Sequence, residues 1–483
     1  MIFLLALSGY FSWADAQQGP ISGGRHITIK LSPLKNTKIF LGSNYGNTLA
    51  LFDSAYLNEK SEGVFQAPAK LTGGIYFLVT KDPNYAIIQG WDFLMDDEQQ
   101  FNILADTSSM ESTTITGSKE NALYAQYSRY STLQNKRIEK LIKEFKDSTS
   151  KKTKKDTANA IKEEAKLRDG VKLYQDSICN KYPDALLSAL FNTMKRPPIK
   201  EIPTINGKKD STYPFRYYKE HYWDDVNFAD DRILHTPFFE AKLDEYFKNL
   251  VSIEADSIIK EVNYILLFAR TGKEIYPFLL NKFTKQYMNP QYMGQDKVFV
   301  FLFENFYAKG DTTLLDASNK KIVTERAYNL MANQIGLPAV PMNFVDTAGR
   351  PAPLYGLKSK FTFVVFWDPT CGHCKIEIPR LDSMYRAKWK AMGVSIYAVN
   401  INELELKAWK NFIIDNKLTG WVHAHETAAN QRATEKANQM NFRQAYDAKF
   451  TPTFYLLDED KHIIAKKLSL EQFDEIMKLK MKK

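Results

Sequence analysis

Two thiols three positions apart form the part of this sequence best suited to chemistry. Cys371 and Cys374 are separated by a Gly-His dipeptide and follow a predominantly apolar run, residues 361–367. The run predicts a strand, and the pattern from residue 375 onward predicts a helix. That order places the first sulfur at a helix N-terminus, where unpaired N–H groups and the helix dipole favour a thiolate. A thiolate is the nucleophile of disulfide exchange, so the spacing predicts redox chemistry on other thiols.

The alternative use of a Cys-x-x-Cys pair is one half of a structural zinc site. Such a site needs four ligands, and the chain has 3 Cys. The third, Cys179, lies far upstream and is predicted to be a buried helix thiol. His373, His423 and His425 are the histidines that could complete a site, and the latter two alternate, which predicts a solvated strand face. The sequence therefore favours a redox pair, and no metal or cofactor is expected.

A Thr-Pro dipeptide directly before an apolar run, residues 453–457, is the second element with a chemical consequence. Proline cannot donate a ladder hydrogen bond, so Pro452 is predicted at the entry of a strand, and the Thr451–Pro452 bond can be cis. Taken alone, Pro452 would be interpreted as a trans proline without a role. Its position downstream of the cysteine pair, after βα patterning, favours a place beside the redox site.

The sequence from about residue 338 to the C-terminus resembles the thioredoxin fold, and within it the TlpA/ResA-like membrane-side thiol–disulfide oxidoreductases of bacteria. The resemblance implies that Cys371 attacks, that Cys374 resolves the mixed disulfide, and that cis Pro452 with Thr451 forms a substrate-docking turn. The Gly-His dipeptide is typical of protein disulfide isomerases, and a protonated His373 would add positive charge near the sulfur. The matching residues are Phe366, Trp367, Cys371, Gly372, His373, Cys374, Glu377, Pro379, Thr451 and Pro452.

One position departs from the thioredoxin pattern. Thioredoxins keep a buried Asp in the strand before the motif as proton acceptor for the resolving cysteine, and this chain has Val365 there. TlpA/ResA-like proteins carry an acid in the following helix instead, and Glu377 matches that place. Two interpretations stay open: Glu377 assists proton transfer at Cys374, or it is an ordinary solvated glutamate.

The composition describes an ordered chain of several domains. It has 483 residues, 44% of them hydrophobic and 13% aromatic, which is enough for about two to four folded domains. A net charge of +9, from 65 Lys and Arg against 56 Asp and Glu, gives surfaces of mixed sign and excludes the footprint of a nucleic-acid binder. The lysines at residues 151–155 lack interleaved aromatics and are predicted on a solvated loop or helix face.

The first residues predict export. Residues 1–11 form an apolar stretch too short to span a bilayer, and Ala14 and Ala16 give the small-x-small pattern of a signal-peptidase site, so residues 1–16 are predicted to be a signal peptide. The usual basic residues before it are missing, which leaves an upstream start open. No cysteine suited to a lipid anchor follows, and no later segment is predicted to be transmembrane. A periplasmic or cell-envelope location is expected, which fits a chain with so few cysteines.

Three regions are predicted to follow. Residues 17–117 show short alternating segments that predict an antiparallel β-sandwich, residues 118–335 show helical periodicity and predict an all-α module, and residues 336–483 predict the α/β thioredoxin-like redox domain. The aromatic-rich stretch 217–228 is predicted to be core rather than a ligand groove, and residues 336–341 a linker. The first two regions resemble the modules that precede the redox domain in TlpA-like proteins, through residues 53–57, 63–65, 74–76, 117–121 and 217–228.

Two functions are expected from these features. The first is an exported thiol–disulfide oxidoreductase that exchanges with protein disulfides and thiols and is kept reduced by a membrane electron donor. The second is an envelope-binding protein whose front domains recognise a partner, with redox activity secondary. The Gly-His dipeptide hints at a less reducing couple than Gly-Pro, but the TlpA/ResA-like resemblance implies a reductant and is given more weight. Peroxidase chemistry is disfavoured, because thioredoxin-fold peroxidases attack with a cysteine in a different local setting.

Overall fold

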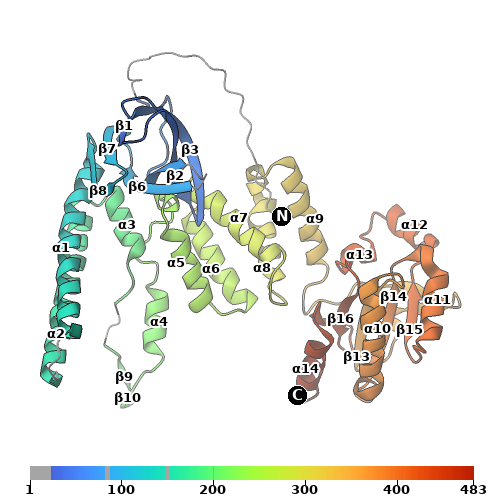
Figure 1. The fold of residues 1–483 in the computed structure, drawn as a ribbon. Helices are drawn as coiled ribbons and strands as arrows, with labels where there is room; N and C mark the ends of the chain where they lie inside the picture. The colour runs from blue at the N-terminus through green and yellow to red at the C-terminus, as the bar shows by residue number, and fades with distance from the viewer. Residues whose placement is uncertain (1–22, 82–86, 148–152, 199–200, 483) are drawn as a thin grey trace. The chain divides into compact units, whose positions relative to one another are not determined.

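The computed structural model describes residues 23–81, 87–147, 153–198 and 201–482 (Figure 1). The chain divides into two compact units, residues 1–250 with 268–276 and residues 251–267 with 277–483. The predicted signal peptide, residues 1–16, lies outside the described residues and stays a prediction. In the part of the chain that is described, no helix has both the length and the apolar character needed to cross a bilayer.

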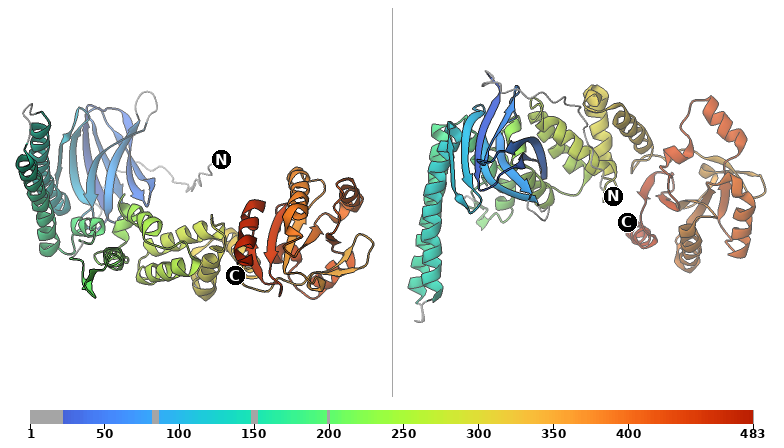
Figure 2. Two further views of the ribbon diagram at one scale, coloured as in Figure 1. Left: turned by 90° about the horizontal axis from the view of Figure 1, so that it is seen from below. Right: turned by 45° about the horizontal axis from the view of Figure 1, so that its top comes forward.

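The first unit begins with two four-stranded sheets of order β4-β1-β7-β8 and β3-β2-β5-β6 (Figure 2). Alternate residues of the strands, such as Ile27, Ile29 and Leu31, point into one shared core. The sandwich is confirmed, with one correction: β1 and β7 run parallel, an arrangement open to two strands that no tight hairpin has to join. The strands are β1 (Arg25–Ser32), β2 (Thr37–Tyr45), β3 (Thr48–Leu57), β4 (Glu62–Ala67), β5 (Gly74–Lys81), β6 (Ile87–Met95), β7 (Gln100–Asp106) and β8 (Ser109–Thr116).

A helical region follows the sandwich in the first unit. Its aromatic residues Tyr222, Trp223 and Phe228 are buried, so the prediction that the aromatic stretch is core is confirmed. The region is not all-α, because β9 and β10 form a small antiparallel hairpin about Asn206 and Gly207. The elements are α1 (Lys119–Asp147), α2 (Lys154–Lys181), α3 (Leu186–Met194), β9 (Thr204–Ile205), β10 (Lys208–Lys209), α4 (Tyr213–Glu220), η1 (Asp231–His235) and α5 (Phe239–Asn249).

The second unit contains most of four further helices and the C-terminal α/β domain. The predicted helical module, residues 118–335, is thus divided between the two units. The predicted module boundaries, after residues 117 and 335, stay proposals from the sequence. The helices before the α/β domain are α6 (Ala255–Phe268), α7 (Ile275–Met288), α8 (Asp296–Asn305), η2 (Tyr307–Lys309), η3 (Asp311–Leu314) and α9 (Ala317–Met331).

The α/β domain is built on an open seven-stranded sheet of order β12-β11-β15-β14-β13-β16-β17. The strands are β11 (Asn343–Asp346), β12 (Pro351–Pro353), β13 (Phe361–Trp367), β14 (Val394–Asn400), β15 (Val422–His425), β16 (Thr453–Leu457) and β17 (Ile463–Lys466). The helical segments are η4 (Leu354–Gly356), α10 (Gly372–Met384), η5 (Tyr385–Trp389), η6 (Glu403–Glu405), α11 (Leu406–Asp415), α12 (Ala428–Lys436), α13 (Phe442–Ala445) and α14 (Leu470–Met481).

Strand β13 lies inside this sheet, parallel to β14 and antiparallel to β16. All its residues are buried. Val365 and Trp367 belong to the core that α10 and α14 cover, whereas Val364 and Phe366 belong to the core on the opposite face. An apolar run without alternation is what a strand covered on both faces requires. The expected order of sandwich, helical region and α/β domain is therefore confirmed.

The segment predicted as a linker, residues 336–341, is paired with the sheet. The N–H groups of Gly336 and Ala339 donate to the carbonyls of Ile463 and Lys461, each at 2.8 Å, and the Ile463 N–H donates to the Leu337 carbonyl at 2.8 Å. These bonds cover the outer edge of β17, which would otherwise present unpaired backbone groups. The chain therefore enters the α/β domain as an addition to its sheet.

Candidate active site around the cysteine pair

A tight turn connects β13 to α10 and fixes the position of Cys371. The Asp368 carboxylate accepts hydrogen bonds from the Thr370 N–H and hydroxyl, both at 2.7 Å, and the Cys371 N–H donates to the Asp368 carbonyl at 3.2 Å. Cys371 is the N-cap residue of α10, with extended φ and ψ of −70° and 127°. The predicted order of strand, turn and helix is confirmed.

The two cysteines occupy different environments. Cys371 is partly exposed, whereas Cys374, in the first turn of α10, is 0% exposed and belongs to the core beneath the helix. Both are free thiols. Only Cys371 is therefore open to attack a disulfide of another molecule.

The acidities of the two thiols diverge. Burial acts to raise the pKa of Cys371, but hydrogen bonds with the Thr451 side chain and with the backbone N–H groups of Cys374 and His373 lower it below its ordinary value of 9.0. Burial raises the pKa of Cys374 to about 12. Hydrogen bonds that stabilise an anion favour the thiolate, and desolvation disfavours it. At neutral pH the exposed sulfur is the better nucleophile, and the buried one keeps its proton.

The predicted turn before β16 lies against the Cys371 sulfur. The Thr451–Pro452 peptide bond is cis, and the Cys371 thiol donates to the Thr451 carbonyl at 3.4 Å. Residues eighty positions apart are thus brought together because β16 pairs with β13. The geometry agrees with the expectation that these residues form one site.

The remaining residues singled out in the sequence lie around this pair. Trp367 is fully buried, and its ring packs on Phe412 with centroids 5.2 Å apart. His373 is exposed. The partly buried Glu377 carboxylate accepts a hydrogen bond from Arg380 at 3.1 Å. The roles expected for these side chains stay predictions.

Two histidines belong to β15, and the third cysteine belongs to the first unit. His423 and His425 share a face of β15, but the expected solvation is wrong for His423, whose Nε2 lies 2.8 Å from the Leu418 carbonyl and whose ring stacks on Trp421. Burial lowers its pKa below 6.5. Cys179 is a buried thiol of α2, as predicted. Among the described residues, no group of three or more His, Cys, Asp or Glu is placed to hold a metal ion.

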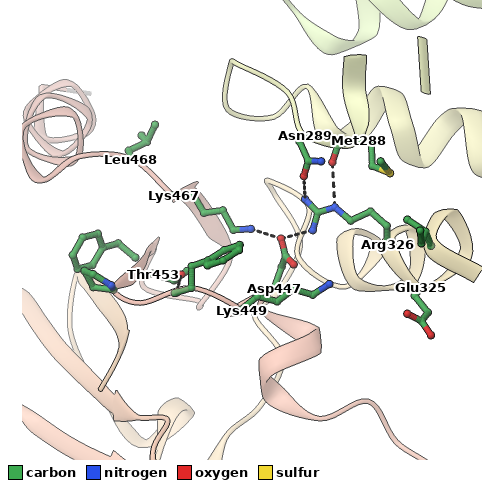
Figure 3. Close-up of a pocket in the computed structure, with 13 residues that line it drawn as sticks. Met288, Asn289, Glu325, Arg326, Asp447, Lys449, Thr453, Lys467 and Leu468 are labelled. Carbon is green, nitrogen blue, oxygen red and sulfur yellow. Dashed lines mark hydrogen bonds and ion pairs between the residues drawn. The ribbon is translucent and has the colours of Figure 1, made fainter. Parts of the chain in front are cut away.

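A groove adjoins the turn at Pro452 (Figure 3), and nothing in the sequence indicates it. It has a volume of about 650 Å³. One wall comes from α9 and the residues that follow α7, and the other from the residues around β16 and after β17. The elements that form it are far apart in sequence, so no motif spacing could have predicted it.

Comparison with known proteins gives this site its class. Residues 352–479 match the thioredoxin-like domain family, and residues 131–333 match a family described as a domain of unknown function, DUF5106. The C-terminal domain is therefore a thioredoxin-like domain.

The family follows from the sequence relatives. The thiol–disulfide oxidoreductase ResA of Bacillus cereus is 31% identical over 133 residues, which cover 28% of this chain and 69% of the relative. The chain belongs to the TlpA/ResA-like family of the thioredoxin superfamily, and the protein is an oxidoreductase of thiols and disulfides.

Two solved structures are also similar. A domain of a possible thiol-disulfide isomerase from Cytophaga hutchinsonii is 33% identical, covers 31% of this chain and 93% of its own, and has a TM-score of 0.27. A thioredoxin-like protein from Bacteroides caccae is 20% identical, covers 59% of this chain and 99% of its own, and has a TM-score of 0.43.

Proposed function

We propose that this protein is an exported thiol–disulfide oxidoreductase that exchanges disulfides with protein thiols through Cys371 and Cys374. The observation that carries the proposal is the contrast between the two sulfurs at one helix N-terminus. Cys371 is partly exposed with a lowered pKa, and Cys374 is buried with a pKa of about 12. Such a pair suits an attacking and a resolving thiol.

The exchange proceeds in two balanced steps. The Cys371 thiolate attacks one sulfur of a substrate disulfide and bonds to it, and the other substrate sulfur leaves as a thiolate and takes up a proton. Cys374 then loses its proton and attacks the Cys371 sulfur, which forms the internal disulfide and releases the first substrate sulfur. The protein loses two electrons, and the substrate gains them.

The neighbouring residues are proposed to support these steps. Thr451 and Pro452 are proposed to dock the substrate chain, because they lie against the reactive sulfur. His373 would add positive charge near Cys371 when protonated, and Trp367 would hold the end of β13 beneath the turn. Glu377 is proposed to help remove the proton of Cys374, whose raised pKa makes that step demanding.

The direction and the partners are part of the same proposal. We propose that the protein reduces substrate disulfides in the periplasm or cell envelope and that a membrane electron donor returns two electrons to its disulfide. Support comes from its family, since the ResA relatives are named thiol–disulfide oxidoreductases, and from the signal-peptide pattern in residues 1–16.

A second candidate function has an observation of its own. A cavity of about 510 Å³ in the first unit is lined mainly by apolar side chains, among them Phe77, Phe93, Leu190 and Phe191. Apolar cavities of this size are typical of ligand sites. The protein could therefore act first as an envelope-binding protein, with redox activity secondary.

Turnover of insulin disulfides with dithiothreitol distinguishes the two candidates. The wild type should accelerate reduction, and Cys371→Ser should lose that acceleration. Cys374→Ser should trap a mixed disulfide through Cys371, visible as a mass increase. Cys179→Ala is the matched control, since this thiol lies in α2 of the first unit and is not part of the proposed site. Equal activity of the wild type and Cys371→Ser would reject the first candidate.

A further inference from the structure

We propose that the groove beside Pro452 binds an extended stretch of the substrate protein next to its reacting cysteine, and that it favours an apolar side chain with acidic neighbours. The inference rests on the proposed function and extends it. Under this proposal, α9 and the end of α7 contribute to substrate specificity, although neither segment belongs to a redox motif.

The groove adjoins the turn that contacts the Cys371 sulfur. Pro452 lines it, and the preceding residue, Thr451, contributes the carbonyl that lies 3.4 Å from the Cys371 sulfur. A substrate chain bonded to Cys371 and docked on this turn therefore comes next to the groove residues that begin at Pro452. The volume of about 650 Å³ lies within the range of about 300–1,000 Å³ for small-molecule sites, so it has room for a few side chains.

Apolar surface is exposed on both walls of this groove. Phe450, just before the docking turn, is 83% exposed, and Ile322 of α9 is 50% exposed. Met288 and Leu468 line the same space. Large apolar side chains gathered in one concave surface mark an interaction site, because covering them releases water. An apolar side chain of the substrate would supply that cover.

An ionic bridge joins the two walls (Figure 3). The buried Asp447 carboxylate accepts from Arg326 of α9 at 2.5 Å and from Lys467, which follows β17. Arg326 also donates to the Met288 carbonyl and the Asn289 side chain, both at 3.1 Å. Because three acceptors hold the Arg326 guanidinium, α9 is a fixed wall of the groove.

The charges that line the groove have a positive excess. Arg326, Lys449 and Lys467 outnumber Glu325 and Asp447, and Asp447 is already bonded to two of the cations. Lys449 is exposed at the rim. Complementary charge at a rim selects partners chiefly through the rate of association. Acidic residues beside the apolar one are therefore favoured, and basic residues are disfavoured.

The test uses the full-length protein and peptides whose single cysteine is joined by a disulfide to thionitrobenzoate, so that its release is followed by absorbance. One peptide has Leu beside the cysteine with Glu neighbours, a second has Leu with Lys neighbours, and a third has Gly and Ser. The symmetric thionitrobenzoate disulfide, which carries no peptide, reports the reactivity of the cysteine pair itself. Each rate constant is divided by that reference.

Two groove variants and one control are compared by this ratio. Ile322→Glu should lower the ratio for the Leu-Glu peptide about tenfold, and Lys449→Glu should move the preference from the Glu to the Lys peptide by about threefold. Ile414→Glu is the matched control, because Ile414 of α11 is 71% exposed and is not among the groove residues. It should leave every ratio unchanged. Both groove residues have exposed side chains, so folding is expected to persist.

The outcomes separate the two proposals. If the wild type reacts with the reference disulfide but has the same rate ratio for all three peptides, the groove proposal is overturned and the proposed redox function stands. Ratios in both groove variants within about twofold of the wild-type value would overturn it as well. A wild type that reacts with no disulfide, the reference included, would overturn the proposed function and the groove with it.

Discussion

Cys371 and Cys374 are the same amino acid three positions apart, and only their surroundings make them chemically different. The backbone N–H groups of the first turn of α10 and the Thr451 side chain stabilise charge on Cys371, whereas the core beneath the helix excludes water from Cys374. An exchange site needs this asymmetry. In the proposed exchange, the readily ionised sulfur attacks the substrate disulfide, and the buried sulfur reacts only with the mixed disulfide that has formed beside it.

Alkylation with iodoacetamide should show this difference. Thiolate, not thiol, is alkylated, so the labelling rate of each cysteine rises as the pH passes its pKa. Cys371 should reach its half-maximal rate below its ordinary pKa of 9.0, and Cys374, with a pKa of about 12, should stay unlabelled across the neutral range. Peptide mass analysis at each pH measures both. Equal labelling of the two cysteines, or a Cys371 midpoint above 9.0, would contradict the assignment.

Glu377→Gln should slow the second step of the exchange. If the carboxylate accepts the proton of Cys374, its loss should reduce the release of substrate from the mixed disulfide by about tenfold or more and change its pH dependence. Stopped-flow measurement of that release separates it from the first attack. Glu471→Gln is the control, since both glutamates bind Arg380 but Glu471 lies on α14. A release rate that is unchanged at every pH would mean that Glu377 is only a surface partner of Arg380.

At the scale of elements, a buried ion pair ties α8 to β17. The Lys466 ammonium lies 2.5 Å from the Asp296 carboxylate and donates to the carbonyl and side chain of Asn333. Both charged side chains are about 5% exposed. Two charges removed from water are tolerated only while they compensate each other. The pair therefore specifies how this helix meets the edge of the sheet.

Asp296→Asn should be strongly destabilising because it leaves the Lys466 charge buried without its counter-ion. The free energy of unfolding should fall by about 3 kcal/mol, measured by urea denaturation. The neighbouring pair of Lys297 and Asp256 provides the control, since its side chains are 53% and 79% exposed. Asp256→Asn should cost less than about 1 kcal/mol. Similar losses of unfolding free energy in the two variants would show that burial of the Lys466–Asp296 pair does not add to its contribution to stability.

A structural feature could be predicted from the sequence where a few neighbouring residues determine it. The order of strand, turn and helix around Cys371 and the strands of the sandwich depend on short periodic patterns, so the sequence predicts them. The hairpin at Asn206 and Gly207 was missed although this dipeptide, with positive φ at both residues, is a standard signal for a two-residue turn. The burial of His423 depends on what covers β15, and the Pro452 groove on helices far upstream, so neither has a local signal.

For the whole molecule, two kinds of site lie in different units. The cysteine pair and its groove belong to the second unit, and the apolar cavity lined by Phe77 and Phe191 belongs to the first. Chemistry at the cysteine pair needs no residue of that cavity. A reductant and a ligand-binding protein can therefore coexist in one chain, and the direction of electron flow is the property that defines the protein as a whole.

The standard potential of the cysteine pair decides that direction. Lowering the pKa of Cys371 stabilises the reduced form and raises the potential, while the buried Cys374, protonated to about pH 12, limits the effect to one sulfur. We expect a value between about −270 and −180 mV, the range from thioredoxin to protein disulfide isomerase. Equilibration with glutathione buffers, followed by acid quenching and alkylation, measures it.

The dipeptide between the cysteines provides the internal comparison. His373→Pro should lower the potential by about 30 mV, equivalent to about 1.4 kcal/mol, because it removes a side chain that can place positive charge near the thiolate. A wild-type potential near about −120 mV, the value of the strong oxidant DsbA, would reverse the proposed direction. The thiolate would then be stabilised so far that the protein would give disulfides to its substrates instead of removing them.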